Sequence, residues 1–60
     1  MYLFEAHYMD TVSGIDIIKP IEFNNQFFSD QRDCYLYAMG KAYDMTKPEE
    51  LFSSLEFISS

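Results

Sequence analysis

Two segments near the start of the chain alternate between inward and outward side chains, and this alternation constrains the fold more than any other feature. In Tyr2–Met9 the large apolar and aromatic residues of one face occupy even-numbered positions, whereas in Ile15–Phe23 they occupy odd-numbered positions. A period of two is typical of a β-strand that buries one face. The residues between, Asp-Thr-Val-Ser-Gly at 10–14, favour a turn. The two segments therefore predict an antiparallel hairpin.

The opposite parity of the two inward faces also predicts the register of the hairpin. Inward residues must face one another across the ladder, so paired positions must sum to an odd number. A loop of Thr11–Gly14, closed by Asp10 and Ile15, meets this condition. The inward pairs are then Tyr8 with Ile17, Ala6 with Lys19, Phe4 with Ile21 and Tyr2 with Phe23.

Lys19 and Pro20 are the two residues that do not suit this second strand. Lys19 falls on the inward face opposite the small Ala6, where its aliphatic stem can follow apolar surface toward water. Pro20 has no amide hydrogen to give to a ladder, so the second strand is expected at a sheet edge. A bulge at Pro20 is the alternative explanation for the position of Lys19.

The segment Asp30–Met45 has the spacing of an amphipathic helix, with Ser29 as its N-cap and Asp30 in its first turn. At about 100° per residue, one arc collects the residues expected to be buried. They are Cys34, Tyr35, Ala38, Met39, Ala42 and Met45, with Leu36 and Tyr43 at the border. The opposite side carries Asp30, Asp33, Tyr37, Lys41 and Asp44.

The last twelve residues fit two structures. Residues 46–49 resemble a capping box with Pro in the first turn, whereas 54–58 alternate like a strand. Because a third strand would cover more of the helix, we predict one helical turn at Pro48–Phe52 and a strand at Ser54–Ser59. The predicted fold class is α+β in the order β-β-α-β, a three-stranded antiparallel sheet with one amphipathic helix on one face. The alternative is β-β-α-α.

Sixty residues suffice for a single domain, 1–60. In a domain of this size the free energy gained by burying apolar surface nearly equals the free energy lost by ordering the chain. One cysteine excludes an internal disulfide, and the chain has no Cys/His cluster of the kind that binds structural zinc. Five Tyr and six Phe leave aromatic packing and self-association as the means of stabilisation. We expect no cofactor and no metal.

Ten acidic residues against four basic ones give a formal net charge of −6. This charge disfavours direct contact with nucleic-acid phosphates. The chain has no run of about 20 apolar residues for a membrane span and no export signal at its start. Together with the lone thiol, these features favour a cytoplasmic protein.

Two residues are candidates for catalysis, and each has a simpler explanation. His7, the only histidine, lies beside Glu5 on the outward face and could act as a general acid or base, but exposed strand histidines are common. Cys34 follows the start of the helix, where a thiol can be activated, but it also suits the buried arc. Because the chain matches no catalytic motif, we expect no enzyme activity.

Two surfaces are candidates for protein binding. On the outward sheet face, four apolar residues lie among four carboxylates, as in many interfaces. The apolar set, a candidate self-association surface, is Leu3, Met9, Ile18 and Ile58, and the acidic set is Glu5, Asp16, Glu22 and Glu56. The helix offers the other partner-binding surface, and the one favoured by the sequence, made of Asp30, Asp33, Tyr37 and Asp44.

The leading functional hypothesis is a small acidic protein-binding module, an inhibitor or regulator that occupies a basic groove of a nucleic-acid-handling protein. Its carboxylates would stand in for phosphates, and its negative field would speed encounter with a basic partner. In size and charge the chain resembles the small acidic antirestriction and anti-CRISPR inhibitors of phages and mobile elements, a likeness of composition alone. The alternative is a structural homodimer that associates through the outer sheet face.

Overall fold

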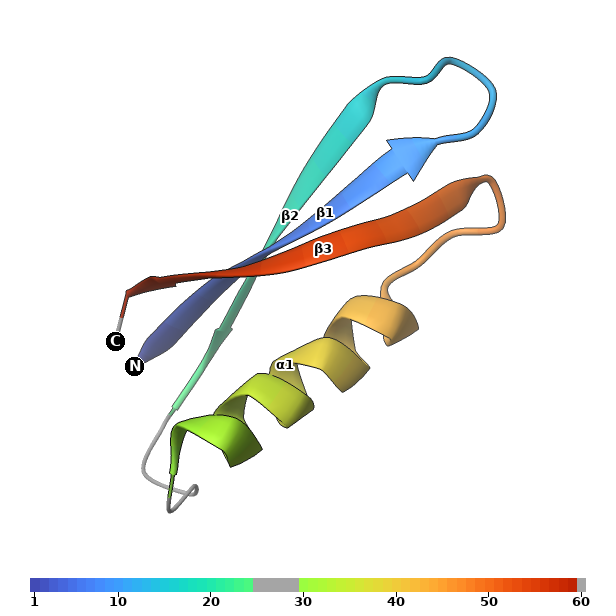
Figure 1. Ribbon diagram of the computed structural model, residues 1–60. Coiled ribbons are helices and arrows are strands. Elements are labelled where there is room, and N and C mark those ends of the chain that lie inside the picture. The colour runs from blue at the N-terminus through green and yellow to red at the C-terminus, as the bar shows by residue number, and fades with distance from the viewer. Residues whose placement is uncertain (25–29, 60) are drawn as a thin grey trace.

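The chain folds into a three-stranded antiparallel sheet with one helix packed on one face (Figure 1). The computed structural model describes residues 1–24 and 30–59. The elements are β1 (Tyr2–Asp10), β2 (Asp16–Phe23), α1 (Gln31–Asp44) and β3 (Glu50–Ser59). The strand order β2-β1-β3 places the N-terminal strand in the centre. The α+β fold in β-β-α-β order is thus confirmed, and the alternative with a second helix is wrong.

The hairpin of β1 and β2 has the predicted register. Its inward pairs are Tyr8 with Ile17, Ala6 with Lys19, Phe4 with Ile21 and Tyr2 with Phe23. The carboxylate of Asp10 closes the loop by accepting the backbone N–H groups of Val12 and Ser13 at 2.8 and 3.0 Å. These hydrogen bonds lower the pKa of Asp10. Gly14 supplies the positive φ, +74°, that the loop requires.

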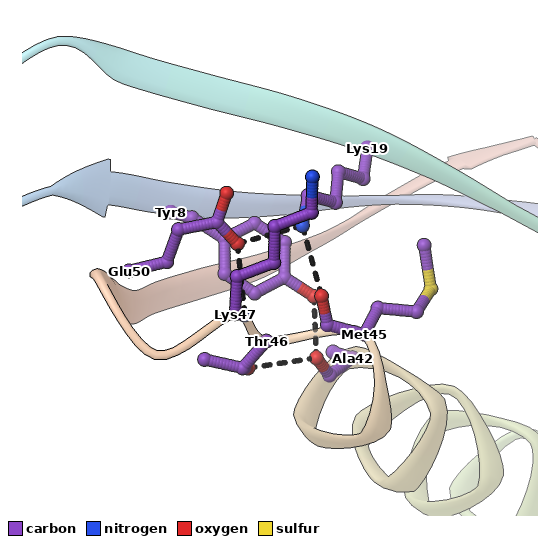
Figure 2. Close-up of polar contacts among 7 residues, drawn as sticks. All are labelled: Tyr8, Lys19, Ala42, Met45, Thr46, Lys47 and Glu50. Carbon is purple, nitrogen blue, oxygen red and sulfur yellow. Dashed lines mark hydrogen bonds and ion pairs between the residues drawn. The ribbon is translucent and has the colours of Figure 1, made fainter.

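Strand β2 lies at the sheet edge, as Pro20 predicts, and it pairs with β1 without a bulge. Lys19 therefore reaches the inward face in regular register, where its side chain is 18 % exposed and its ammonium group has partners within the protein. Figure 2 shows that Lys19 Nζ contacts Glu50 Oε1 at 2.7 Å and the backbone oxygen of Met45 at 2.8 Å. It also lies 4.5 Å from the centre of the Tyr8 ring. The ammonium group neutralises a buried carboxylate and binds the C-terminal end of α1, where a helix favours a cation.

Helix α1 begins one residue later than predicted, and its N-cap is Asp30, whose carboxylate accepts the N–H of Asp33 at 2.9 Å. The predicted cap, Ser29, lies outside the described residues. Only Cys34, Ala38 and Ala42 are buried, so the predicted buried arc is too wide. The exposed members of that arc and its border are Tyr35, Leu36 and Tyr43. A single helix contacts a sheet along a narrow stripe of residues four apart, and larger side chains on either side remain partly in solvent.

Strand β3 begins at Glu50, four residues before the predicted strand, so the predicted helical turn at Pro48–Phe52 is wrong. The chain instead turns at 47–50, where the N–H of Glu50 donates to Lys47 O at 3.0 Å. The Glu50 carboxylate in turn accepts the Lys47 N–H at 3.1 Å. Pairing with β1 gives the backbone of residues 50–52 hydrogen-bond partners and brings the Phe52 ring against Tyr8. A single helical turn would provide neither interaction.

The core is small and largely aromatic around a centre of alanines. Ala6, Ala38 and Ala42 are fully buried, and their small side chains let α1 approach β1 closely. At one end of the core the Phe4 and Phe23 rings stack at 5.8 Å. Aromatic packing therefore contributes to the stability of this core.

The helix covers only part of one sheet face. Its 14 residues span about 21 Å at 1.5 Å per residue, whereas the molecule extends over 39 Å. In Figure 1, α1 runs beneath the sheet, and no helix or strand of the described residues lies over the opposite face. We call this opposite face the outer face.

Candidate functional site

The outer face can be assigned residue by residue from the strand register. The buried residues Phe4, Ala6 and Tyr8 face the helix, so the alternate positions of β1 and their partners face away from it. Along the strands, the rows of directly paired residues are Leu3 with Glu22 and Ser59, Glu5 with Pro20 and Glu56, His7 with Ile18 and Ser54, and Met9 with Asp16 and Leu51. Ile58 follows the inward-facing Phe57 at an irregularity of β3.

The predicted self-association residues do not form one continuous patch. Met9 pairs directly with Leu51 and lies diagonally from Ile18, and these three side chains are 39 %, 56 % and 53 % exposed. Leu3 and Ile58 lie at the other end of the face, beyond the central row of charged residues. The sequence prediction missed Leu51 because it placed this residue in a helical turn.

All four predicted carboxylates of the sheet lie on the outer face: Glu5, Asp16, Glu22 and Glu56. Glu5 and Glu56 are directly opposite one another across β1 and β3, an arrangement in which like charges repel. His7 lies beside them, with its Nε2 at 3.4 Å from Glu56 Oε2. Asp16 and Glu22 are six residues apart on β2, so the carboxylates extend over about 20 Å of strand.

The basic residues lie elsewhere in the molecule. Lys19 is paired with Glu50 beneath the sheet, and this hydrogen bond lowers the pKa of Glu50. Arg32 and Lys41 belong to α1, and Lys47 precedes β3. Within residues 1–24 and 30–59, the outer face therefore has no lysine or arginine to offset its carboxylates.

The helix surface is more mixed in charge. The carboxylate of Asp30 caps the helix, and Lys41 lies between Asp33 and Asp44 in the sequence. The Tyr37 ring packs against Phe23 at 4.8 Å, and Lys41 Nζ lies 5.7 Å from its centre. Because α1 packs on the sheet face opposite the outer face, the two predicted surfaces lie on opposite sides of the molecule, and one flat partner cannot contact both.

Of the two candidate catalytic residues, Cys34 is placed as its simpler explanation predicts, whereas His7 is partly buried rather than exposed. Cys34 is buried, with 1 % of its surface exposed, which confirms the interpretation as a small core residue. Burial, followed by the neighbouring Cys34 thiol, raises the pKa of Tyr2. His7 lies on the open outer face, 28 % exposed. An apolar hollow lies at the other side of the sheet, near the start of α1, between Tyr35 and Phe57.

Comparison with protein-family models, with curated proteins and with solved structures gives no match to this chain. In the described part of the chain, α1 is too short and too polar to cross a membrane. The fold and the surface define a small acidic α+β domain with an uncovered sheet face.

Proposed function

We propose that the protein is a small acidic protein-binding module and that its outer face docks on a basic surface of a partner protein. The observation that carries the proposal is the charge of this face, four carboxylates among exposed apolar side chains and, among the described residues, no lysine or arginine. Apolar contacts surrounded by uncompensated charge favour a partner of the opposite charge.

A basic groove that normally holds nucleic acid is the partner surface that this face suits best. The carboxylates lie along about 20 Å of antiparallel strands and can take the places of successive phosphates. The net charge of −6 speeds encounter with such a groove and makes the complex sensitive to salt. The protein would then act as an inhibitor or regulator, and its lone thiol suits a partner in the cytoplasm.

The two candidate surfaces can be separated by a pair of charge-matched variants. Asp16→Lys with Glu22→Lys changes the outer face, and Asp33→Lys with Asp44→Lys changes the helix by the same four charge units. Immobilised wild type and variants are incubated with a cell lysate, and the captured basic proteins are eluted with increasing salt. We expect the outer-face variant to capture at least tenfold less of the partner than the wild type, and the helix variant to capture as much as the wild type.

Three results would contradict this proposal. The helix variant could lose the partner while the outer-face variant retains it, which would assign binding to α1. Both variants could lose the partner equally, which would indicate a response to net charge alone. Finally, duplex DNA could fail to compete with the protein for its captured partner, which would exclude mimicry of nucleic acid.

A structural homodimer is the second candidate function. It is favoured by the exposed apolar cluster of Met9, Ile18 and Leu51 on the uncovered face. A symmetric dimer through this face would, however, bring eight carboxylates together, and like charges across an interface are costly. Light scattering at micromolar concentration tests this candidate, because a dimer of this kind must strengthen as salt is added, and a monomer at all salt concentrations removes it.

A further inference from the structure

Three side chains with metal-binding atoms meet at the centre of the outer face. Glu5 and His7 are on β1, and Glu56 is on β3 directly opposite Glu5. One oxygen of each carboxylate and a ring nitrogen of His7 all lie within 4.8 Å of one another. The cluster is brought together by pairing between residues about fifty positions apart, so it does not appear as a sequence motif.

The imidazole of His7 is left with an unsatisfied atom. Its Nε2 is buried and makes no hydrogen bond among the described residues, because the 3.4 Å contact with Glu56 Oε2 lacks hydrogen-bond geometry, although part of the ring reaches solvent. Buried polar atoms without partners are uncommon and costly in native proteins. The same site holds two carboxylates in direct opposition, which is also unfavourable. A single cation placed among the three groups would remove both costs.

We propose that Glu5, His7 and Glu56 form a binding site for a divalent transition-metal ion, with Zn²⁺ as the best match. Zinc accepts one imidazole nitrogen and carboxylate oxygens at about 2.0–2.2 Å, usually with tetrahedral geometry. Bonds of that length separate neighbouring ligand atoms by about 3.4 Å. The observed 3.4 Å between His7 Nε2 and Glu56 Oε2 fits one edge of such a tetrahedron. A side-chain rotation of Glu5 supplies the third ligand.

The donor set selects against the common alkaline-earth ions. Ca²⁺ takes six to eight oxygen ligands, and Mg²⁺ prefers oxygen in octahedral geometry with several waters. An imidazole nitrogen with two carboxylates instead suits borderline metals such as zinc. Three protein ligands leave the fourth position of the zinc open toward solvent, because the outer face is uncovered. The metal would also link β1 to the edge strand β3.

This site shares Glu5 and Glu56 with the face proposed to dock on a partner, but metal binding can be measured on the purified protein with no partner present. Purified full-length protein, freed of metal with a chelator, is titrated with zinc chloride by calorimetry. We expect one zinc per chain and no displacement by millimolar Mg²⁺ or Ca²⁺. The variants Glu56→Gln and His7→Asn should each weaken binding at least tenfold. Glu22→Gln, which removes the same charge from the same face outside the cluster, should change the affinity less than twofold.

The single histidine allows a direct spectroscopic reading that does not depend on whether the variants fold. In nuclear magnetic resonance spectra of the wild type, the Nε2 signal of His7 should move on addition of one equivalent of zinc. The proposal is wrong if that signal does not move, or if zinc binding does not saturate. It is equally wrong if Glu22→Gln weakens binding as much as Glu56→Gln, since that result would indicate diffuse attraction to an acidic surface.

Discussion

The carbonyl oxygen of Ala42 provides a quantitative test of how the helix is held on the sheet. The last carbonyls of a helix have no partner within it, and they need donors from outside. Here the buried Tyr8 hydroxyl donates to Ala42 O, and the Thr46 hydroxyl donates to the same atom at 3.1 Å (Figure 2). One side chain comes from the central strand and the other from the chain beyond the helix, so the carbonyl joins two elements.

The expected cost of losing either donor is modest, whereas losing both is severe. Tyr8→Phe retains the buried ring and its contact with Lys19, and it removes one hydrogen bond, about 1 kcal/mol. Thr46→Val removes the other at a similar cost. The double variant leaves a buried carbonyl without either donor, which adds a desolvation penalty of about 1–3 kcal/mol. The double variant should therefore cost about 1–3 kcal/mol more than the sum of the single variants.

The wild type, the two single variants and the double variant form a double-mutant cycle. Their free energies of unfolding are measured by urea denaturation, with far-ultraviolet circular dichroism as the signal. In a domain of sixty residues, a change of 1 kcal/mol in the free energy of unfolding also shifts the melting temperature by about 8 °C. The effect of each single variant is therefore large enough to measure by heating as well as by urea. If the double variant unfolds without urea, trimethylamine oxide is added to all four samples. Tyr8→Phe combined with Thr11→Val is the control, because the Thr11 hydroxyl donates to a different oxygen, Glu49 O at 2.9 Å. A double variant that costs no more than the sum would refute the reasoning.

Two further predictions concern stability. Phe4→Ala should cost about 3–5 kcal/mol and unfold the domain at 25 °C, whereas Leu36→Ala, at a 57 % exposed position, should stay within about 0.5 kcal/mol by urea denaturation. Hydrogen bonds lower the folded-state pKa of Asp10 and Glu50 below their ordinary values of 3.8 and 4.5. Their contribution is complete above about pH 5 and is lost as the pH falls through the folded pKa values, so urea midpoints should drop toward pH 3. Asp10→Asn should flatten that dependence, and an unchanged slope would contradict the assignment.

Local patterns in the sequence are sufficient for the hairpin. Alternation with opposite parity predicts all four inward pairs of β1 and β2, because a slip of one residue would move every buried side chain into water. The same rule places Lys19 on the inward face and the acidic residues of these two strands on the outer one. The helix is predicted to within a residue at each end, since its three buried positions repeat every four residues.

The number of helix residues that are buried against the sheet could not be predicted from periodicity. Periodicity reports the direction of a side chain around the helix axis and does not report how much surface the opposite element covers. With one helix on an elongated sheet, Tyr35 and Leu36 lie beside the contact rather than within it. The sequence prediction therefore identified the correct side of the helix and overestimated how much of it is buried.

The sequence by itself determined the elements whose partners are close along the chain, namely the hairpin, its register and the amphipathic helix. Only the tertiary structure decided where β3 begins, what neutralises Lys19, and that Glu56 faces Glu5 and His7. The physical reason is that the sequence of residues 46–53 is nearly as compatible with a local turn or helix as with a strand. Hydrogen bonding to a β1 that is already in place decides between them, and local patterns do not contain that interaction.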